Sequence, residues 1–343
     1  MGLYYTIAFY QERIMMVTNS HIISAGRFGL FVIIILLHIA TLAINYVNGT
    51  RIAEFPRTIQ NIDRQISILF HHTWNYQKEH LANIVFIVIR FAEWFVIIRV
   101  LQYTIDPFGT AKLIDGLIMT TAFNWVNIGY QVNAVSWLII LSTIRKRFSV
   151  LNHHLRMTLL DDSIPHKDPH QLHRLTLKLG ILHSQLCDTV DCFNHCHSTT
   201  MMFSLAPAFG FTVFSWFGLI HAYAARVDEL VLHSWTTVTL SFNYISFVFY
   251  VVLFSAKVND QIKQTAIVVH KAIGYRTYDK EESRQLKKFS QQLWHHSPSI
   301  VCELFAFDWE LVYTMIGSLS TYLVILMQFD LVNYSNYNTT TKH

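Results

Sequence analysis

Gln328 is the side chain whose position in this sequence most restricts its chemistry. It stands near the end of residues 311–329, an apolar run without one charged side chain. About 20 apolar residues in a helix cross the hydrocarbon core of a bilayer. An amide inside that core is costly unless it meets protein or water. The sequence therefore predicts a membrane helix that turns this position toward a partner helix or a wet passage.

Three more side chains, Thr321, Ile325 and Phe329, share this helical face, because residues three and four apart are neighbours on a helix. Repeated around an axis, Gln328 would form a ring of amides whose oxygens partly replace the water around a cation, and apolar rings would gate by dewetting. The alternative is a hydrogen bond from Gln328 across a helix interface. The residues alone favour neither interpretation. Asp308 and Glu310, at the helix start, either attract cations or favour the helix N-terminus.

Aromatic and amide side chains gather in one half of several other apolar runs. They suit a small polar organic ligand, because aromatic rings supply contact area and amides orient the ligand. For any single residue, a place in an interfacial aromatic belt or an interhelical hydrogen bond is the favoured reading. The cluster consists of Gln102, Tyr103, Asn124, Trp125, Asn127, Tyr130, Trp216, His221, Trp235, Thr239 and Asn243. The candidates selected from it for ligand contact are Tyr103, Asn124, Trp125, Tyr130, Trp216, Trp235 and Asn243.

Charged side chains interrupt one apolar run, residues 83–103. Arg90 and Glu93 are three residues apart and can pair on a helix. Each charge costs about 2.5–3.5 kcal/mol at the middle of a membrane, so an inward-packed pair that holds the bundle is the favoured interpretation. Arg99, further along the run, is the better candidate for contact with a ligand.

Residues 183–197 hold several cysteines and histidines but do not form a zinc motif. Cys192 and Cys196 are one helical turn apart, and no Cys-x-x-Cys pair occurs. The stretch continues an amphipathic leucine stripe, so a packed helix is favoured over a metal site. Neither a metal nor a cofactor is expected, and the four cysteines give no disulfide framework.

Composition places the chain in a membrane, since 52% of its residues are hydrophobic and only 14% are charged. No P-loop, Rossmann glycine pattern, nucleophile elbow or HExxH motif occurs, so the sequence supports no enzyme activity. The small net charge of +4 gives no reason to expect nucleic-acid binding. Charge gaps predict six strong spans: residues 28–47, 83–103, 116–144, 199–225, 230–256 and 311–329.

Two basic segments orient these spans. Residues 145–178 and 257–288 together hold 15 of the 26 Lys and Arg residues, so both should be cytoplasmic. The C-terminus then lies outside, where the sequons at Asn333 and Asn338 are compatible with it. An N-terminus inside requires one more early span, which is missing or degenerate in residues 1–27. The sequon at Asn48 favours the opposite side, but the basic segments are the stronger signal.

Two motifs resemble those of the insect gustatory receptors, within the seven-helix insect chemoreceptor channel superfamily. The first is T-Y, five apolar residues and Q-F at 321–329, and the second is R-F-S-V-L-N-H-H-L at 147–155. Ala306-Phe307-Asp308 adds weaker support, and the resemblance covers roughly residues 80–330. It implies an all-α bundle of seven transmembrane helices with the N-terminus inside and the C-terminus outside. It maps residues 28–47 to the family's second helix; the alternative is that they are the first and the second is lost.

The resemblance also implies a function: a tastant-gated, non-selective cation channel in the plasma membrane. Four copies, as a homo- or heterotetramer, would line one pore with their last helices, and a pocket in the extracellular half of each subunit would bind the tastant. The rivals are a G-protein-coupled chemoreceptor and a non-conducting or truncated member that needs a partner subunit. The expected divisions are an N-terminal segment 1–27, ligand-binding helices 28–160, an anchor helix 161–198, a transmembrane hairpin 199–256, anchor helices 257–306, a pore helix 307–330 and an extracellular tail 331–343.

Overall fold

The computed structural model of the chain describes residues 21–105, 113–160, 169–226, 228–275, 280–302 and 304–340. Within its helices, the side chains of residues 98–105, 113–126 and 331–340 are among those outside this description. The early span expected in residues 1–27 falls mostly outside it too. The helix expected to begin at residue 28 already begins at His21.

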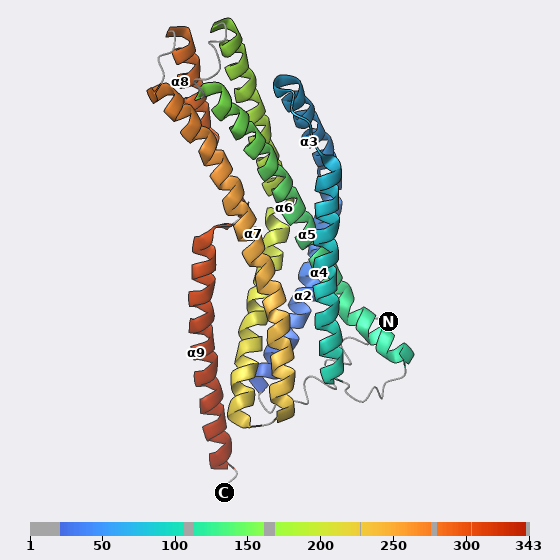
Figure 1. Cartoon of the computed structure of the whole chain (residues 1–343). Coiled ribbons are helices and arrows are strands. Elements are labelled where there is room, and N and C mark those ends of the chain that lie inside the picture. The colour runs from blue at the N-terminus through green and yellow to red at the C-terminus, as the bar shows by residue number, and fades with distance from the viewer. Residues whose placement is uncertain are drawn as a thin grey trace.

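Helices make up almost all of the described chain, as Figure 1 shows. In chain order they are α2 (His21–Val47), α3 (Gly49–Phe70), α4 (Tyr76–Ile105), α5 (Leu113–Leu159), α6 (Pro169–Ala225), α7 (Asp228–Tyr275), α8 (Lys280–His295) and α9 (Trp309–Thr340).

Five helices are long and apolar enough to cross a membrane, counted over the described residues. Their apolar stretches are Phe28–Val47, Tyr76–Ile97, Arg174–Ala224, Leu230–Tyr275 and Trp309–Asp330. Each overlaps one predicted span. The sixth predicted span, residues 116–144, lies inside α5, where part of the side chains are outside the description.

Three helices are much longer than a membrane is thick. At 1.5 Å per residue, the 57 residues of α6 extend about 85 Å, against roughly 30 Å for the hydrocarbon core. Helices α5 and α7 have 47 and 48 residues. Because no stretch rich in glycine, serine or proline interrupts them, they continue past the apolar bundle as helices that also carry charged side chains.

The projecting ends form a packed helical unit, here named the anchor region. It consists of α3, α8, residues 145–159 of α5, residues 169–198 of α6 and residues 257–275 of α7, and it lies at the top of Figure 1. Helix α8 is amphipathic and buries Leu286, Phe289 and Leu293, which recur at helical spacing. These side chains join a core that includes Leu155, Leu159, Leu182, Leu186, Val268 and Val269.

A short hairpin connects the anchor region to the last helix. Strands β1 (Val301–Cys302) and β2 (Phe305–Ala306) pair antiparallel, where the sequence predicts helices throughout 257–306. Two-residue strands have no periodic pattern that the sequence could reveal. Oδ1 of Asp308 accepts a hydrogen bond from the backbone N–H of Leu311 at 3.2 Å, which satisfies one free donor at the start of α9.

Asn48 joins α2 and α3 to the middle of α6. Its Nδ2 donates a hydrogen bond to the carbonyl oxygen of Cys196 at 3.2 Å. The side chain of this sequon asparagine is thus half-buried and hydrogen-bonded to α6.

Candidate functional site

A small cavity with a mainly apolar wall lies among helices α2, α5, α6 and α7. Its volume is about 40 Å³, against roughly 10–15 Å³ for one water molecule on the same measure. Apolar and polar side chains share its wall, as ligand sites require. The lining residues are Ile34, Leu37, His38, Thr41, Asn127, Tyr130, Asn133, Phe203, Ser204, Pro207, Phe211 and Tyr244.

Two tyrosines form the aromatic wall of this cavity. The rings of Tyr130 and Tyr244 meet edge to face, with centroids 4.9 Å apart, and Phe211 packs against Tyr244 at 5.4 Å. The hydroxyl of Tyr244 donates to Oδ1 of Asn127. The hydroxyl of Tyr130 is buried and has no hydrogen-bond partner among the described residues. An unpaired buried hydroxyl is costly, so a ligand or a water in this cavity would gain a hydrogen bond there.

The opposite wall comes from α2, which sequence reasoning did not include in the pocket. His38 and Thr41 are both buried although they stand in the apolar run 28–47. The ring of His38 lies against Gly129 of α5, so closely that any side chain at position 129 would overlap it. Nδ2 of Asn45 donates to Oδ1 of Asn133 at 2.9 Å and joins the two helices. The signal that could have revealed this wall is the set of three polar residues, His38, Thr41 and Asn45, in an otherwise apolar run.

Arg90 lies inside the bundle and is not among the residues that line the cavity. Its side chain is 8% exposed, and Nη1 lies 2.7 Å from Oε2 of Glu93. Nη2 donates to Oδ1 of Asn243 at 3.0 Å, and the guanidinium stands over the ring of Tyr250. The structure thus places Asn243 beside a buried cation. Pairing with a carboxylate and an amide is how a membrane bundle holds a charge.

The other expected ligand contacts divide into two groups. Trp216 packs edge to face against Phe242, and Nε1 of Trp235 donates to the hydroxyl of Tyr223 at 3.0 Å. Both tryptophans lie near the α6–α7 turn and do not line the cavity. The side chains of Arg99, Tyr103, Asn124 and Trp125 lie outside the described residues. Tyr130 is therefore the candidate that the structure brings to the cavity, together with Asn127 of the same cluster.

Helix α9 stands along one side of the bundle and exposes the face singled out in the sequence. Thr321, Ile325, Gln328 and Phe329 are all exposed on this single chain. Only 6% of the stretch Trp309–Asp330 is buried. The edge-to-face pairs Phe209–Tyr322 and Phe249–Trp309 hold α9 against α6 and α7.

Two contacts fix α9 to its own subunit. Ten residues before the end of α9, Oδ2 of Asp330 lies 2.6 Å from Nδ1 of His221 on α6. At its start, Leu311 is buried in the main core. Gln328 therefore stands two residues before Asp330, which contacts the subunit's own bundle.

Arg147 is a buried node that sequence reasoning identified only as part of a motif. Its Nη2 lies 2.9 Å from Oδ2 of Asp63 on α3, and its Nη1 lies 3.0 Å from Oε2 of Glu79 on α4. The guanidinium also stacks over the ring of Trp74 at 4.7 Å. Arg147 and Asp63 are 2% and 1% exposed. One side chain of α5 thus holds α3, α4 and the loop between them.

Asn152, in the same motif, performs the matching role toward α7. Its Nδ2 donates to the carbonyl oxygen of Gln261 at 2.7 Å, and its Oδ1 accepts from Oγ1 of Thr265 at 2.6 Å. The motif at 147–155 therefore has a structural meaning. It places an arginine, an asparagine and two buried leucines at the contact of four helices.

His183 and Cys187, which raised the question of zinc in the sequence, are packed in the anchor region. Sγ of Cys187 lies 3.5 Å from Nδ1 of His183. The ring of His183 meets Phe148 and Phe289 edge to face. Both residues are buried, so this part of α6 is the packed helix that the leucine stripe predicts.

The comparisons with known proteins agree with this architecture. A search of curated proteins gave no significant match. Two solved structures of the insect olfactory receptor OR5 from Machilis hrabei are similar in fold. One has a TM-score of 0.60 at 12% identity, and the other, in complex with eugenol, has 0.59 at 10% identity. Each alignment covers 96% of this chain and 87% of the receptor.

The sequence profile described as 7tm chemosensory receptor matches residues 1–333, which is nearly the whole chain. The match includes both motifs and all of the apolar helices described above. The chain therefore belongs to the 7tm chemosensory receptor family.

Proposed function

We propose that the chain is a gustatory receptor, one subunit of a tastant-gated, non-selective cation channel in the plasma membrane. Four subunits, identical or mixed, surround a pore lined by their α9 helices. The basic segments of the anchor region face the cytoplasm and the C-terminal tail lies outside. The motif at 321–329 supports a taste receptor, and family membership supports a receptor for small molecules.

The observation that carries this proposal is the exposure of Gln328 on an otherwise apolar helix. Its own subunit leaves the amide uncovered. Lipid offers no hydrogen bonds, so the amide needs water or another subunit. A shared aqueous pore supplies both, and Thr321, Ile325 and Phe329 would line the same passage.

The cavity between α2, α5, α6 and α7 is the proposed tastant site. The hydroxyl of Tyr130 offers a free donor, and Tyr244, Phe211 and Phe203 offer aromatic area. The similar fold of a receptor in complex with eugenol supports a small organic ligand for this chain. Because the cavity has room for only a few waters, binding must widen it. The tastant then opens the channel because it binds the wider, open state more tightly than the narrow, closed state. The free energy available for opening is the difference between these two binding free energies.

Current recordings on Gln328→Ala test the pore assignment. Cells expressing the receptor are screened with sugars, bitter compounds and carbon dioxide, and the active compound opens the channel. The substitution should change relative permeability or single-channel conductance. Ser320→Ala is the matched control, because Ser320 is polar and exposed on the same helix but lies roughly 80° away around its axis. Equal permeability and conductance in Gln328→Ala and the wild type would refute pore lining.

The side of the membrane on which the tail lies separates this proposal from a G-protein-coupled receptor. An epitope added after His343 should be stained in intact cells. Staining only after permeabilisation would favour the rival. Surface expression without current under every tastant would favour a member that conducts only with a partner subunit.

A further inference from the structure

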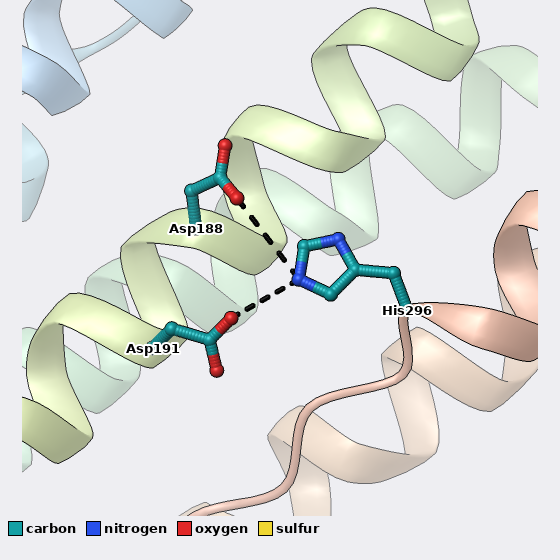
Figure 2. Close-up of side chains that lie close together, drawn as sticks. All are labelled: Asp188, Asp191 and His296. Atoms are coloured by element: carbon teal, nitrogen blue, oxygen red, sulfur yellow. Dashed lines mark hydrogen bonds and ion pairs between the residues drawn. The ribbon is translucent and has the colours of Figure 1, made fainter.

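Three side chains from distant parts of the sequence converge beside α6, outside the cavity and the last helix (Figure 2). Nε2 of His296 lies 3.0 Å from Oδ2 of Asp191 and 4.0 Å from Oδ1 of Asp188. All three atoms lie within 4.8 Å of one another. Ligands of one tetrahedral Zn²⁺ ion, each about 2.0–2.2 Å from the metal, are roughly 3.3 Å apart. Small side-chain rotations therefore suffice to place one ion between the three groups.

The backbone that carries His296 is already fixed to α6. Its carbonyl oxygen accepts a hydrogen bond from Sγ of Cys187 at 3.7 Å. Asn194 donates to the carbonyl oxygen of Ser299 at 2.7 Å and accepts from the N–H of Val301 at 3.2 Å. The imidazole is thus brought to the two carboxylates by contacts that need no ion. A preorganised set of ligands binds a metal without a large ordering cost.

The local charge also favours a cation. Asp188 and Asp191 are one helical turn apart on α6, and both carboxylates are exposed to water. Within the described part of the chain, both carboxylates lie near the imidazole of His296, and neither pairs with a lysine or arginine. Two adjacent carboxylates repel each other, and a divalent ion between them would remove that repulsion.

We propose that Asp188, Asp191 and His296 form a Zn²⁺ site that ties α6 to the segment leading into α9. One imidazole nitrogen with two carboxylate oxygens is a ligand set for Zn²⁺, whereas Ca²⁺ and Mg²⁺ prefer oxygen alone. The fourth position of the tetrahedral ion would be taken either by water or by His195. His195 is exposed and stands four residues after Asp191, which is the helical spacing of a further ligand.

A bound ion would stabilise a particular junction. The segment from His296 to Ile300 leads into β1, β2 and then α9 (Figure 1). Clamping it to α6 would reduce motion where the anchor region meets the last helix. The site thus acts on the connection to α9 and stands apart from the cavity in both position and ligand chemistry.

Zinc titration of the full-length chain tests the site. The protein is purified in detergent without a polyhistidine tag and titrated with Zn²⁺ against a chromogenic chelator. His296→Ala should bind one Zn²⁺ equivalent fewer, or bind that equivalent at least about tenfold more weakly. Loss of an outer-shell partner already weakens metal affinity by about tenfold or more, and His296 is proposed as a direct ligand. His295→Ala, at the exposed neighbouring position, should match the wild type. Equal zinc binding by His296→Ala and the wild type would overturn the proposal.

A second measurement separates a built site from general binding to the chain's 19 histidines. Zn²⁺ should slow amide hydrogen exchange in residues 296–302 of the wild type. Asp191→Asn keeps the shape of the side chain but removes a charged ligand, so Zn²⁺ should leave its exchange rates unchanged. Exchange in this segment that does not respond to Zn²⁺ in the wild type would contradict the site even if some zinc is bound.

Discussion

The anchor region and α9 are both helical and rich in apolar residues, yet their own subunit covers them very differently. Leu186 is fully buried in the anchor region, whereas Phe329 on α9 is 61% exposed. Half of the apolar stretch of α6 is buried, against 6% in α9. The anchor region thus has a packed core within one chain, although Trp294 and Tyr275 at its surface are 85% exposed, whereas α9 leaves nearly all of its apolar stretch uncovered by its own subunit. Substitutions in the core of the anchor region should therefore lower the stability of a single subunit, whereas substitutions on the exposed face of α9 should leave that stability almost unchanged.

Breaking the Arg147 node should give the largest loss of stability. Arg147→Met leaves Asp63 as a buried charge without its partner, which costs about 3–5 kcal/mol. The expected result is a strongly lowered melting temperature in detergent and little receptor at the cell surface. Lys146→Met is the control, since Lys146 is 40% exposed and its pair with Glu79 is worth about 1 kcal/mol or less. Similar melting of the two variants would show that Arg147 holds nothing together.

One kind of substitution can compare the two regions directly. Leu186→Ala in the anchor region should cost about 2–5 kcal/mol, because it leaves a cavity in a packed core. Ile316→Ala on α9, where the side chain is 56% exposed, should change the stability of a single subunit by about 0.5 kcal/mol or less. Thermal unfolding of dilute, monomeric protein measures both. A large loss at Ile316 would mean that α9 packs on its own subunit more than its exposure indicates.

Removing the hydroxyl of Tyr130 should affect the ligand and leave the fold intact. This hydroxyl has no partner among the described residues, so Tyr130→Phe should not lower the melting temperature. Losing one ligand hydrogen bond of about 0.5–1.5 kcal/mol should raise the half-maximal tastant concentration by roughly 2- to 12-fold. Tyr223→Phe, whose hydroxyl meets Trp235 away from the cavity, is the control. An unchanged dose response would remove Tyr130 from the tastant site.

The contact between His221 and Asp330 should contribute little to stability. Both side chains are partly exposed, so Asp330→Asn should cost about 1 kcal/mol or less. The loss should instead appear as faster hydrogen exchange in the last turns of α9 after Met327. Exchange that stays as slow as in the wild type would show that other contacts hold this end of the helix.

The sequence predicted the parts of the fold that depend on long patterns. The length of the apolar runs predicted the membrane-spanning helices. The leucine stripe predicted the packed helix in α6, because helical periodicity shows which face of a helix is buried. The motifs at 147–155 and 321–329 indicated an insect chemoreceptor, which the match to the chemosensory receptor family confirms. The hairpin at 301–306 was not predictable, since two-residue strands leave no pattern.

The cavity was only partly predictable, for a physical reason. Tyr130 and Asn127 were found because aromatic and amide side chains are unusual in apolar runs. His38 and Thr41 are equally unusual, but which helix packs beside α5 depends on tertiary contacts such as Gly129 against His38. The partners of Arg147 were hidden for the same reason, since Asp63 and Glu79 are far from it in sequence.

Cysteine accessibility at position 328 tests the central claim most directly. Gln328→Cys is made in a Cys192→Ser background, because the other three cysteines are buried. It is then exposed to a charged, water-soluble thiol reagent during current recording. If position 328 lines an aqueous pore, modification should be rapid and should block the current. Leu326→Cys should react slowly, because Leu326 is less exposed and lies one turn after Tyr322, which packs against Phe209 of α6. A cysteine at 328 that resists the reagent, or reacts without changing the current, would contradict an aqueous pore along this face.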